Sequence, residues 1–136
     1  MKTIKPFLIL SLLFSFALIS CNDDDQEQIV LQDSDLIGKW KLTEIYSDPG
    51  DGSGTYEPTD FDKTLEFSLD GQLTVTNGTI CYINTSTTED TTETYSIDGD
   101  TITTPSCRVI FNFESNNLIV SQSCFEGCGE KYIKVD

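Results

Sequence analysis

The chain has no histidine among its 136 residues, and 8 basic residues stand against 23 acidic ones, for a net charge of −15. The absence of histidine removes the commonest general base and the commonest metal ligand. It also leaves no residue to activate a cysteine thiol in a cysteine–histidine pair. So acidic a surface repels nucleic acid and anionic lipid headgroups. We therefore expect no nucleic-acid partner, no enzymatic activity and no cofactor.

Long apolar runs are missing except near the N-terminus, where two lysines precede an apolar stretch at residues 7–19. This order is typical of a secretory signal, and the stretch is short for a membrane span. It ends in the sequence LISC at 18–21, which resembles a lipobox. The resemblance implies a lipoprotein signal peptide over 1–20 and lipid on Cys21 that anchors the protein to a membrane. The alternative is an ordinary secretory signal that happens to end near a cysteine.

An acidic segment, Asn22-Asp23-Asp24-Asp25, follows this cysteine. It resembles the export signal that sends many lipoproteins of the Bacteroidota to the cell surface, and implies an outer-membrane lipoprotein facing the exterior. The alternative is a solvated tether, which such a composition favours in any compartment. We predict a flexible tether over residues 21–32 and one monomeric domain over residues 33–136.

The domain has the sequence pattern of an all-β protein. Apolar and polar residues alternate after residue 40, and turn-forming residues recur at short intervals. A helical turn is predicted at Asp33–Leu36. Strands are predicted at residues 37–46, 64–68, 72–76, 92–97, 100–104, 108–114, 117–123 and 130–135. Eight strands in up-and-down order can close into an antiparallel barrel, whereas a ninth strand at 79–84, the alternative, would make the first and last strands parallel.

The predicted hairpins bring apolar residues together on one face. A three-residue loop ending at Gly71 pairs Phe67 with Leu73 and Leu65 with Val75. A turn at Asp98-Gly99 pairs Tyr95 with Ile102, and a turn at Ser115-Asn116 pairs Phe113 with Leu118 and Phe111 with Val120. Side chains alone nearly fill a barrel of eight strands, so we expect at most a small cavity.

The motif Gly38-Lys39-Trp40 opens the first predicted strand. G-x-W at this place resembles the lipocalin signature, and the runs LEFSLDGQLTV, YSIDGDTIT and EKYIKV are similar to small lipocalin-like lipoproteins of the Bacteroidota over residues 34–136. The resemblance implies a minimal lipocalin-like barrel that acts as a binding module for a small apolar or carbohydrate ligand or a protein partner. It also implies that Trp40 plugs the closed end, where lipocalins have an arginine of the last strand over the ring. This chain departs from the family by having Lys134 there, which can still make a cation–π contact. The alternative is a structural envelope lipoprotein with a solid barrel core.

Four cysteines are predicted at the opposite end, and in an exported protein they favour two disulfides. The register across the 115–116 turn places Cys107 opposite Cys124 and favours this pair together with Cys81–Cys128. The competing arrangement joins Cys124 to Cys128 and Cys81 to Cys107.

The first loop at that end is rich in acidic residues and glycine. Its oxygen ligands would suit calcium, but the spacing does not fit an EF-hand. We therefore predict a solvated lid and no metal site. We expect the ligand or partner to bind at this rim, because disulfides would hold its loops rigid. The acidic residues of this rim loop are Asp48, Asp51, Glu57, Asp60 and Asp62.

The lipid anchor is testable through Cys21→Ala. Without the thiol no acyl chain can be attached, so the variant is expected to leave the membrane fraction or to accumulate with its signal uncleaved. Fractionation of cells with an alkaline wash measures this. Complete retention of the variant in the washed membranes would contradict the lipobox.

Overall fold

The structure is a computed structural model, and it describes residues 34–83, 88–124 and 127–136. The predicted signal peptide, Cys21 and the predicted tether lie outside the described residues. A helical turn occupies residues 34–36, and no helix in the described ranges is long and apolar enough to cross a membrane. The strands are β1 (Gly38–Ser47), β2 (Thr55–Pro58), β3 (Thr64–Phe67), β4 (Gln72–Thr76), β5 (Thr91–Thr94), β6 (Ser96–Asp98), β7 (Thr101–Thr103), β8 (Arg108–Glu114), β9 (Asn117–Ser121) and β10 (Glu130–Lys134).

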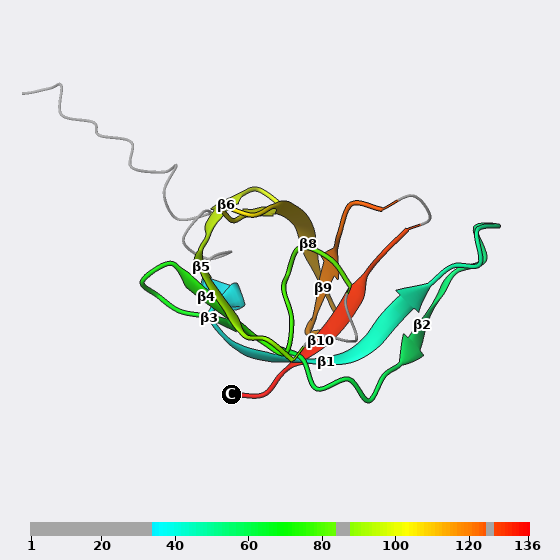
Figure 1. Cartoon of the computed structure of the whole chain (residues 1–136), viewed down its shortest axis with the longest axis horizontal. Coiled ribbons are helices and arrows are strands. Elements are labelled where there is room, and N and C mark those ends of the chain that lie inside the picture. Colours follow the sequence, from blue (N-terminus) through cyan, green and yellow to red (C-terminus); the bar gives the residue numbers. More distant parts are fainter. Residues whose placement is uncertain (1–33, 84–87, 125–126) are drawn as a thin grey trace, which may run out of the picture.

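The strands form one antiparallel sheet that curls into a nearly closed barrel (Figure 1). Nine of them follow the order β5-β4-β3-β1-β10-β9-β8-β7-β6, and β2 pairs with β1 alone. The two strands at the ends of this order, β5 and β6, are consecutive in the chain, with Tyr95 between them. The chain itself therefore joins the two ends of the order, although β5 pairs only with β4 and β6 only with β7.

The expected count of eight strands was wrong, because one predicted strand is divided. The segment predicted at 92–97 breaks at Tyr95, where the chain leaves β4 and joins β7. At this residue the backbone amide donates to Gly71 O at 2.9 Å. Its ring packs edge-on against Phe67 with centroids 5.2 Å apart. These local contacts take the place of a regular ladder.

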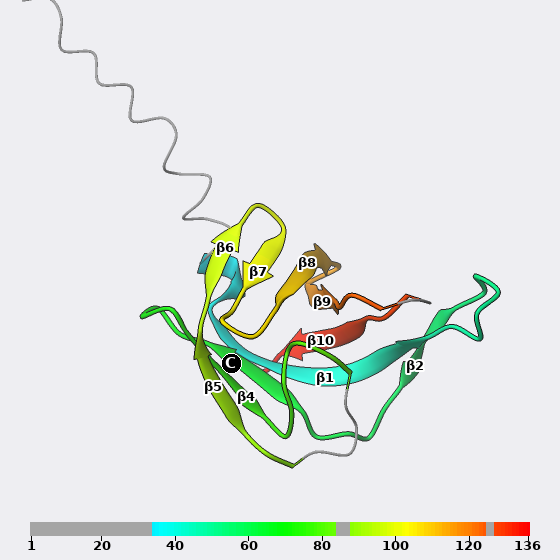
Figure 2. The ribbon, with the colours of Figure 1, turned by 45° about the horizontal axis from the view of Figure 1, so that its top comes forward.

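The second departure is β2, which lies in the segment predicted as a loop. The ten residues of β1 outrun β3, which pairs only with Gly38–Lys41. The rest of β1 pairs with β2, so that Tyr46 lies opposite Tyr56. In Figures 1 and 2 this hairpin extends to one side of the barrel. The Gly- and Asp-rich turn between the two strands concealed β2 in the sequence.

Two of the three predicted hairpin registers are confirmed. Phe67 pairs with Leu73 and Leu65 with Val75, and the pairs Phe113–Leu118 and Phe111–Val120 are also present. The third was wrong, because Ile102 pairs with Ile97 and not with Tyr95. The turn lies one residue later than predicted, with Gly99 at a φ of +61° in its first central position.

The barrel interior is filled with apolar side chains. Leu36 from the helical turn is fully buried, and Trp40 is 3% exposed. Ile80 joins this core from the segment after β4, although no strand places it there. The other buried members are Leu42, Leu65, Phe67, Leu73, Val75, Ile102, Val109, Phe111, Leu118, Val120 and Tyr132.

The predicted pairing of the cysteines was also wrong. The disulfides join Cys81 to Cys107 and Cys124 to Cys128, with Cα atoms 5.6 and 5.9 Å apart. The ladder between β8 and β9 ends at the pair Ile110–Ser121, so the expected register does not continue to Cys124. Ile80 is buried in the core, and it carries its neighbour Cys81 to Cys107.

Trp40→Ala tests how much the stability of the domain depends on the part of the core around Trp40. Deletion of a buried indole is expected to lower the free energy of unfolding by about 3–5 kcal/mol, a large share of the stability of a small domain. Urea denaturation measures this loss. Leu69→Ala is the control, because the Leu69 side chain is 89% exposed. Equal unfolding midpoints for the two variants would contradict the role of Trp40 in the core.

Candidate functional site: the two ends of the barrel

Trp40 is held at one end of the barrel by the segment before β1. Its indole Nε1 donates to Leu36 O at 2.8 Å, which satisfies the one polar atom of a buried ring. Lys134 Nζ lies 5.2 Å from the centroid of this ring, the cation–π contact expected from the sequence. The same ammonium donates to Asp35 O at 3.2 Å. The helical turn and the last strand therefore meet over the tryptophan.

A pocket of about 390 Å³ opens at this end of the barrel. Phe113 contributes an aromatic wall, with its ring centroid 5.7 Å from that of Trp40. Asp35, Asn116 and Lys134 bring an acid, an amide and a cation to the same pocket. An aromatic surface with a few polar groups is the composition typical of a small-molecule site.

The other end of the barrel holds a buried ion pair that the sequence analysis missed. Lys63 Nζ donates to both carboxylate oxygens of Glu130, each at 2.9 Å. The two side chains are 0% and 1% exposed. Burial of two charges is costly, and only good geometry with further hydrogen bonds offsets it.

Two neighbours complete the hydrogen bonds of the Glu130 carboxylate. Gln122 Nε2 and Tyr132 OH each donate to Glu130 Oε2 at 2.8 Å. Burial raises the pKa of Tyr132 well above its usual range, and the charge of the Glu130 carboxylate and its hydrogen bond raise it further. Burial lowers the pKa of Lys63, while the neighbouring carboxylate opposes that shift. The four side chains are buried, so their arrangement is that of a structural network.

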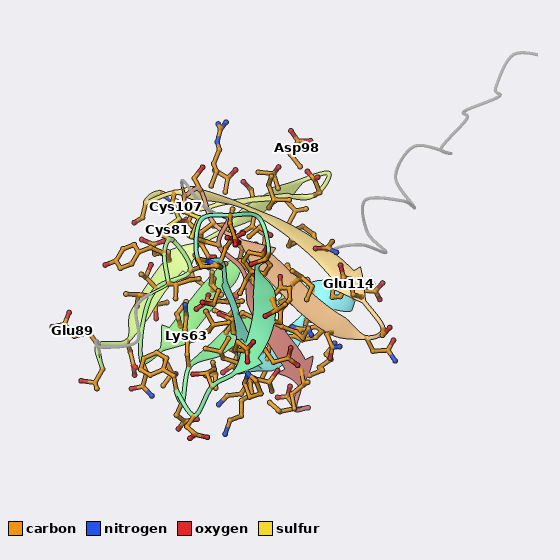
Figure 3. The ribbon with its side chains drawn as sticks, turned by 90° about the vertical axis from the view of Figure 1, so that its right-hand side faces the viewer. Lys63, Cys81, Glu89, Asp98, Cys107 and Glu114 are labelled. Atoms are coloured by element: carbon orange, nitrogen blue, oxygen red, sulfur yellow. A yellow bond between two sulfur atoms is a disulfide. The ribbon has the colours of Figure 1, made fainter. Side chains whose placement is uncertain are left out.

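The segment after β4 covers this network. Ile80 is 1% exposed, and its carbonyl accepts a bond from Gln122 Nε2 at 3.5 Å. The next residue, Cys81, forms the disulfide with Cys107 at the start of β8. Figure 3 shows the two cysteines side by side, with Lys63 on the ribbon of the barrel. The disulfide thus fixes the cover over the buried charges.

The acidic residues of the predicted rim loop do not converge. Asp48 Oδ1 accepts bonds from Gly50 N and Gly52 N, and these bonds lower the pKa of Asp48. Asp51 accepts a hydrogen bond from the Ser53 hydroxyl, and Glu57 lies on β2. Asp62 forms an ion pair with Lys41, with the charged atoms 3.3 Å apart. No group of acids or cysteines in the described part of the chain is arranged to hold a metal ion.

The β1–β2 hairpin carries an aromatic and charged cluster that was not predicted. Tyr46 packs edge-on against Tyr56 with centroids 5.4 Å apart, and Lys131 Nζ lies 4.8 Å from the centroid of Tyr56. Lys131 also pairs with Glu44 at 2.6 Å. Because these groups bind one another, the cluster stabilises the hairpin and leaves few free contacts for a ligand.

Comparisons with known proteins give no family assignment. No protein-family model matches the chain, and no curated protein matches it in sequence. The case for function therefore depends on the geometry of the chain itself.

The buried network is testable through Tyr132→Phe. An unfolded tyrosine titrates near pH 10.0, whereas the folded Tyr132 keeps its proton to higher pH. Above pH 10 the folded state therefore holds more protons than the unfolded state, and this contribution to stability falls as the pH rises. At pH 8 the variant is expected to be less stable by about 1.5–3 kcal/mol, the loss of a hydrogen bond to a charged group. The gap to the wild type should narrow above pH 10.

Urea denaturation between pH 8 and about pH 11 measures this gap. Tyr82→Phe is the matched control, because the Tyr82 side chain is 56% exposed. A gap between wild type and Tyr132→Phe that stays constant over the whole range would show that the phenol is not held protonated by the network.

Proposed function

We propose that this protein is an exported lipoprotein, anchored through lipid on Cys21, whose barrel is a non-enzymatic binding module for a small apolar or carbohydrate ligand. The segment at 1–21 has the order of a lipoprotein signal. The barrel is lipocalin-like if β5 and β6 count as one interrupted strand and β2 as an added hairpin, because eight strands then follow one another up and down. The contact of Lys134 with the ring of Trp40 supports this likeness, with lysine in place of the arginine that lipocalins have there.

The pocket of about 390 Å³ beside Trp40 carries the proposal. Its volume falls within the range of about 300–1,000 Å³ usual for ligand sites. The barrel interior is not the ligand site that we propose, because apolar side chains and the Lys63–Glu130 network fill it. The ring of Phe113 is 37% exposed, so it can pack on a sugar or an apolar body. Lys134 and Asp35 can then orient the polar groups of the ligand.

The proposed location is the outer membrane, with the domain facing the cell exterior. The acidic segment at 22–25 supports export to the surface. Because residue 34 begins the helical turn beside Trp40, the tether joins the barrel at the end that holds the pocket. A ligand bound there would lie on the membrane side of a monomeric domain.

The alternative is a structural lipoprotein of the envelope with no small-molecule ligand. The solid interior of the barrel favours this function, because a lipocalin that carries a ligand inside its barrel needs a cavity. The two functions differ in what they require of the pocket beside Trp40, so one binding experiment separates them.

The fluorescence of Trp40, the single tryptophan of the chain, reports directly on this pocket. The probes are anilinonaphthalene sulfonate, which joins an apolar body to an anion, and the neutral sugar cellobiose. We expect saturable quenching of Trp40 by at least one of them. Loss of a charged contact or of an aromatic wall costs at least about 1.4 kcal/mol, or tenfold in affinity. Lys134→Met is therefore expected to weaken the dye, and Phe113→Ala either probe, about tenfold.

Lys41→Met is the matched control, since it removes the same charge from a lysine whose side chain is half exposed on the outer face of β1. It is expected to bind as the wild type does. Absence of saturable quenching by both probes, or equal affinity in wild type and Phe113→Ala, would favour the structural alternative.

A further inference from the structure

Lys134 is held in a fixed position at the pocket beside Trp40. Its Nζ lies 5.2 Å from the centroid of the Trp40 ring and donates to Asp35 O at 3.2 Å. Its stem lies against the main chain of Gly38, because a Cβ atom at this position would be 2.9 Å from Lys134 Cε. An ammonium has three N–H donors, and the described residues accept a hydrogen bond from one of them. The cation is therefore ordered by the protein and still has donors for a ligand.

Asp35 lines the same pocket but forms no ion pair with Lys134. The lysine donates to the main-chain carbonyl of Asp35 and not to its carboxylate. Neither residue belongs to any of the three ion pairs in the described part of the chain. One pocket therefore holds two opposite charges, and neither charge neutralises the other.

The remaining walls of the pocket add an aromatic surface and an amide. Phe113 is 37% exposed, and its ring packs against that of Trp40. Asn116 lines the pocket from the turn between β8 and β9. A ligand ammonium is attracted by the face of an aromatic ring and can donate hydrogen bonds to an amide oxygen and to a carboxylate. Phe113, Asn116 and Asp35 therefore suit the cation of a ligand, and Lys134 suits its anion.

The charge of the whole chain favours a ligand that carries both signs. A net charge of −15 repels a ligand that is only anionic. A zwitterion has no net charge, so it avoids this repulsion and still supplies an anion to Lys134. Residue 34 begins the helical turn at this pocket, so the proposed anchor would bring the pocket near the membrane. The zwitterions at hand there are phospholipids.

We propose that the ligand of this pocket is a zwitterionic phospholipid with a primary ammonium, the chemistry of a phosphatidylethanolamine. This inference rests on the function proposed above, because it names the ligand of the same pocket. The phosphate accepts hydrogen bonds from Lys134 Nζ, and the ammonium donates to the Asp35 carboxylate and to Asn116. The apolar part of the lipid next to the head group packs on Phe113.

The test is a titration of the chain carrying Cys21→Ala, which has no acyl chain of its own to occupy the pocket. The probe is dihexanoyl phosphatidylethanolamine in monomeric form, followed by the chemical shifts of the Trp40 indole N–H and the Asn116 amide. We expect these shifts to saturate. Dihexanoyl phosphatidylglycerol has the same chains and phosphate but no ammonium, so it should bind about tenfold more weakly.

Two variants separate the contacts of the head group. Asp35→Asn removes the acid that binds the ammonium, so it is expected to weaken the ethanolamine lipid about tenfold without weakening the glycerol lipid. Asp35 is exposed, so this change is compatible with folding. Lys134→Met removes the partner of the phosphate and should weaken both lipids alike. Asp60→Asn is the matched control, since it removes one negative charge from an exposed residue between β2 and β3, and it should bind both lipids as the wild type does.

Equal affinity for the two lipids, or an equal loss in Asp35→Asn and Asp60→Asn, would overturn the proposal. So would glycerophosphoethanolamine that binds as tightly as the dihexanoyl lipid, because the ligand would then be a soluble head group and not a membrane lipid. If neither lipid binds while the dye or cellobiose still quenches Trp40, this inference fails and the proposed binding function stands. If none of these probes binds, both fail.

Discussion

The buried Lys63–Glu130 ion pair is the interaction on which the end of the barrel opposite Trp40 depends. Glu130 begins β10, Lys63 precedes β3, and Gln122 follows β9, so one carboxylate joins three parts of the sheet. Removal of one partner from such a pair leaves a charge buried without compensation, which costs about 3–5 kcal/mol. The pair therefore adds little net stability by itself. Its effect is on specificity: any fold that separates the segments carrying Lys63, Gln122 and Glu130 leaves a buried charge without its partner and is less stable.

The same ion pair takes up space inside the barrel. A barrel of about this size has room for either a packed interior or one small cavity. In this domain apolar side chains fill the middle of the barrel. The charged network, with Ile80 packed over it, fills the end opposite Trp40. Two pockets lie outside this packed interior, one beside Trp40 and one on the outer side of β7, β8 and β9.

The two disulfides have different physical effects. Cys81–Cys107 spans 26 residues and holds the cover of the ion pair against β8, whereas Cys124–Cys128 spans only 4. In the chain-entropy description the longer closed loop restricts the unfolded chain more. The first disulfide also fixes the segment that carries Ile80, which belongs to no strand. Covalent attachment takes the place of sheet hydrogen bonds there.

Alternation along the chain by itself determined the antiparallel strands, two of the hairpin registers and most of the core. The same alternation also predicts that three members of the buried network face inward. Lys63, Gln122 and Glu130 each lie two residues away from an inward apolar residue, namely Leu65, Val120 and Tyr132. The sequence could not predict which of these charged side chains would form a pair. The strands that carry them are far apart in the chain, and neither strand's own pattern names its partner. Only the tertiary structure decided the cysteine pairs, the break at Tyr95 and the β1–β2 hairpin. Each of these features depends on where the pairing between two neighbouring strands ends. Packing across the barrel determines that point, and the local sequence does not.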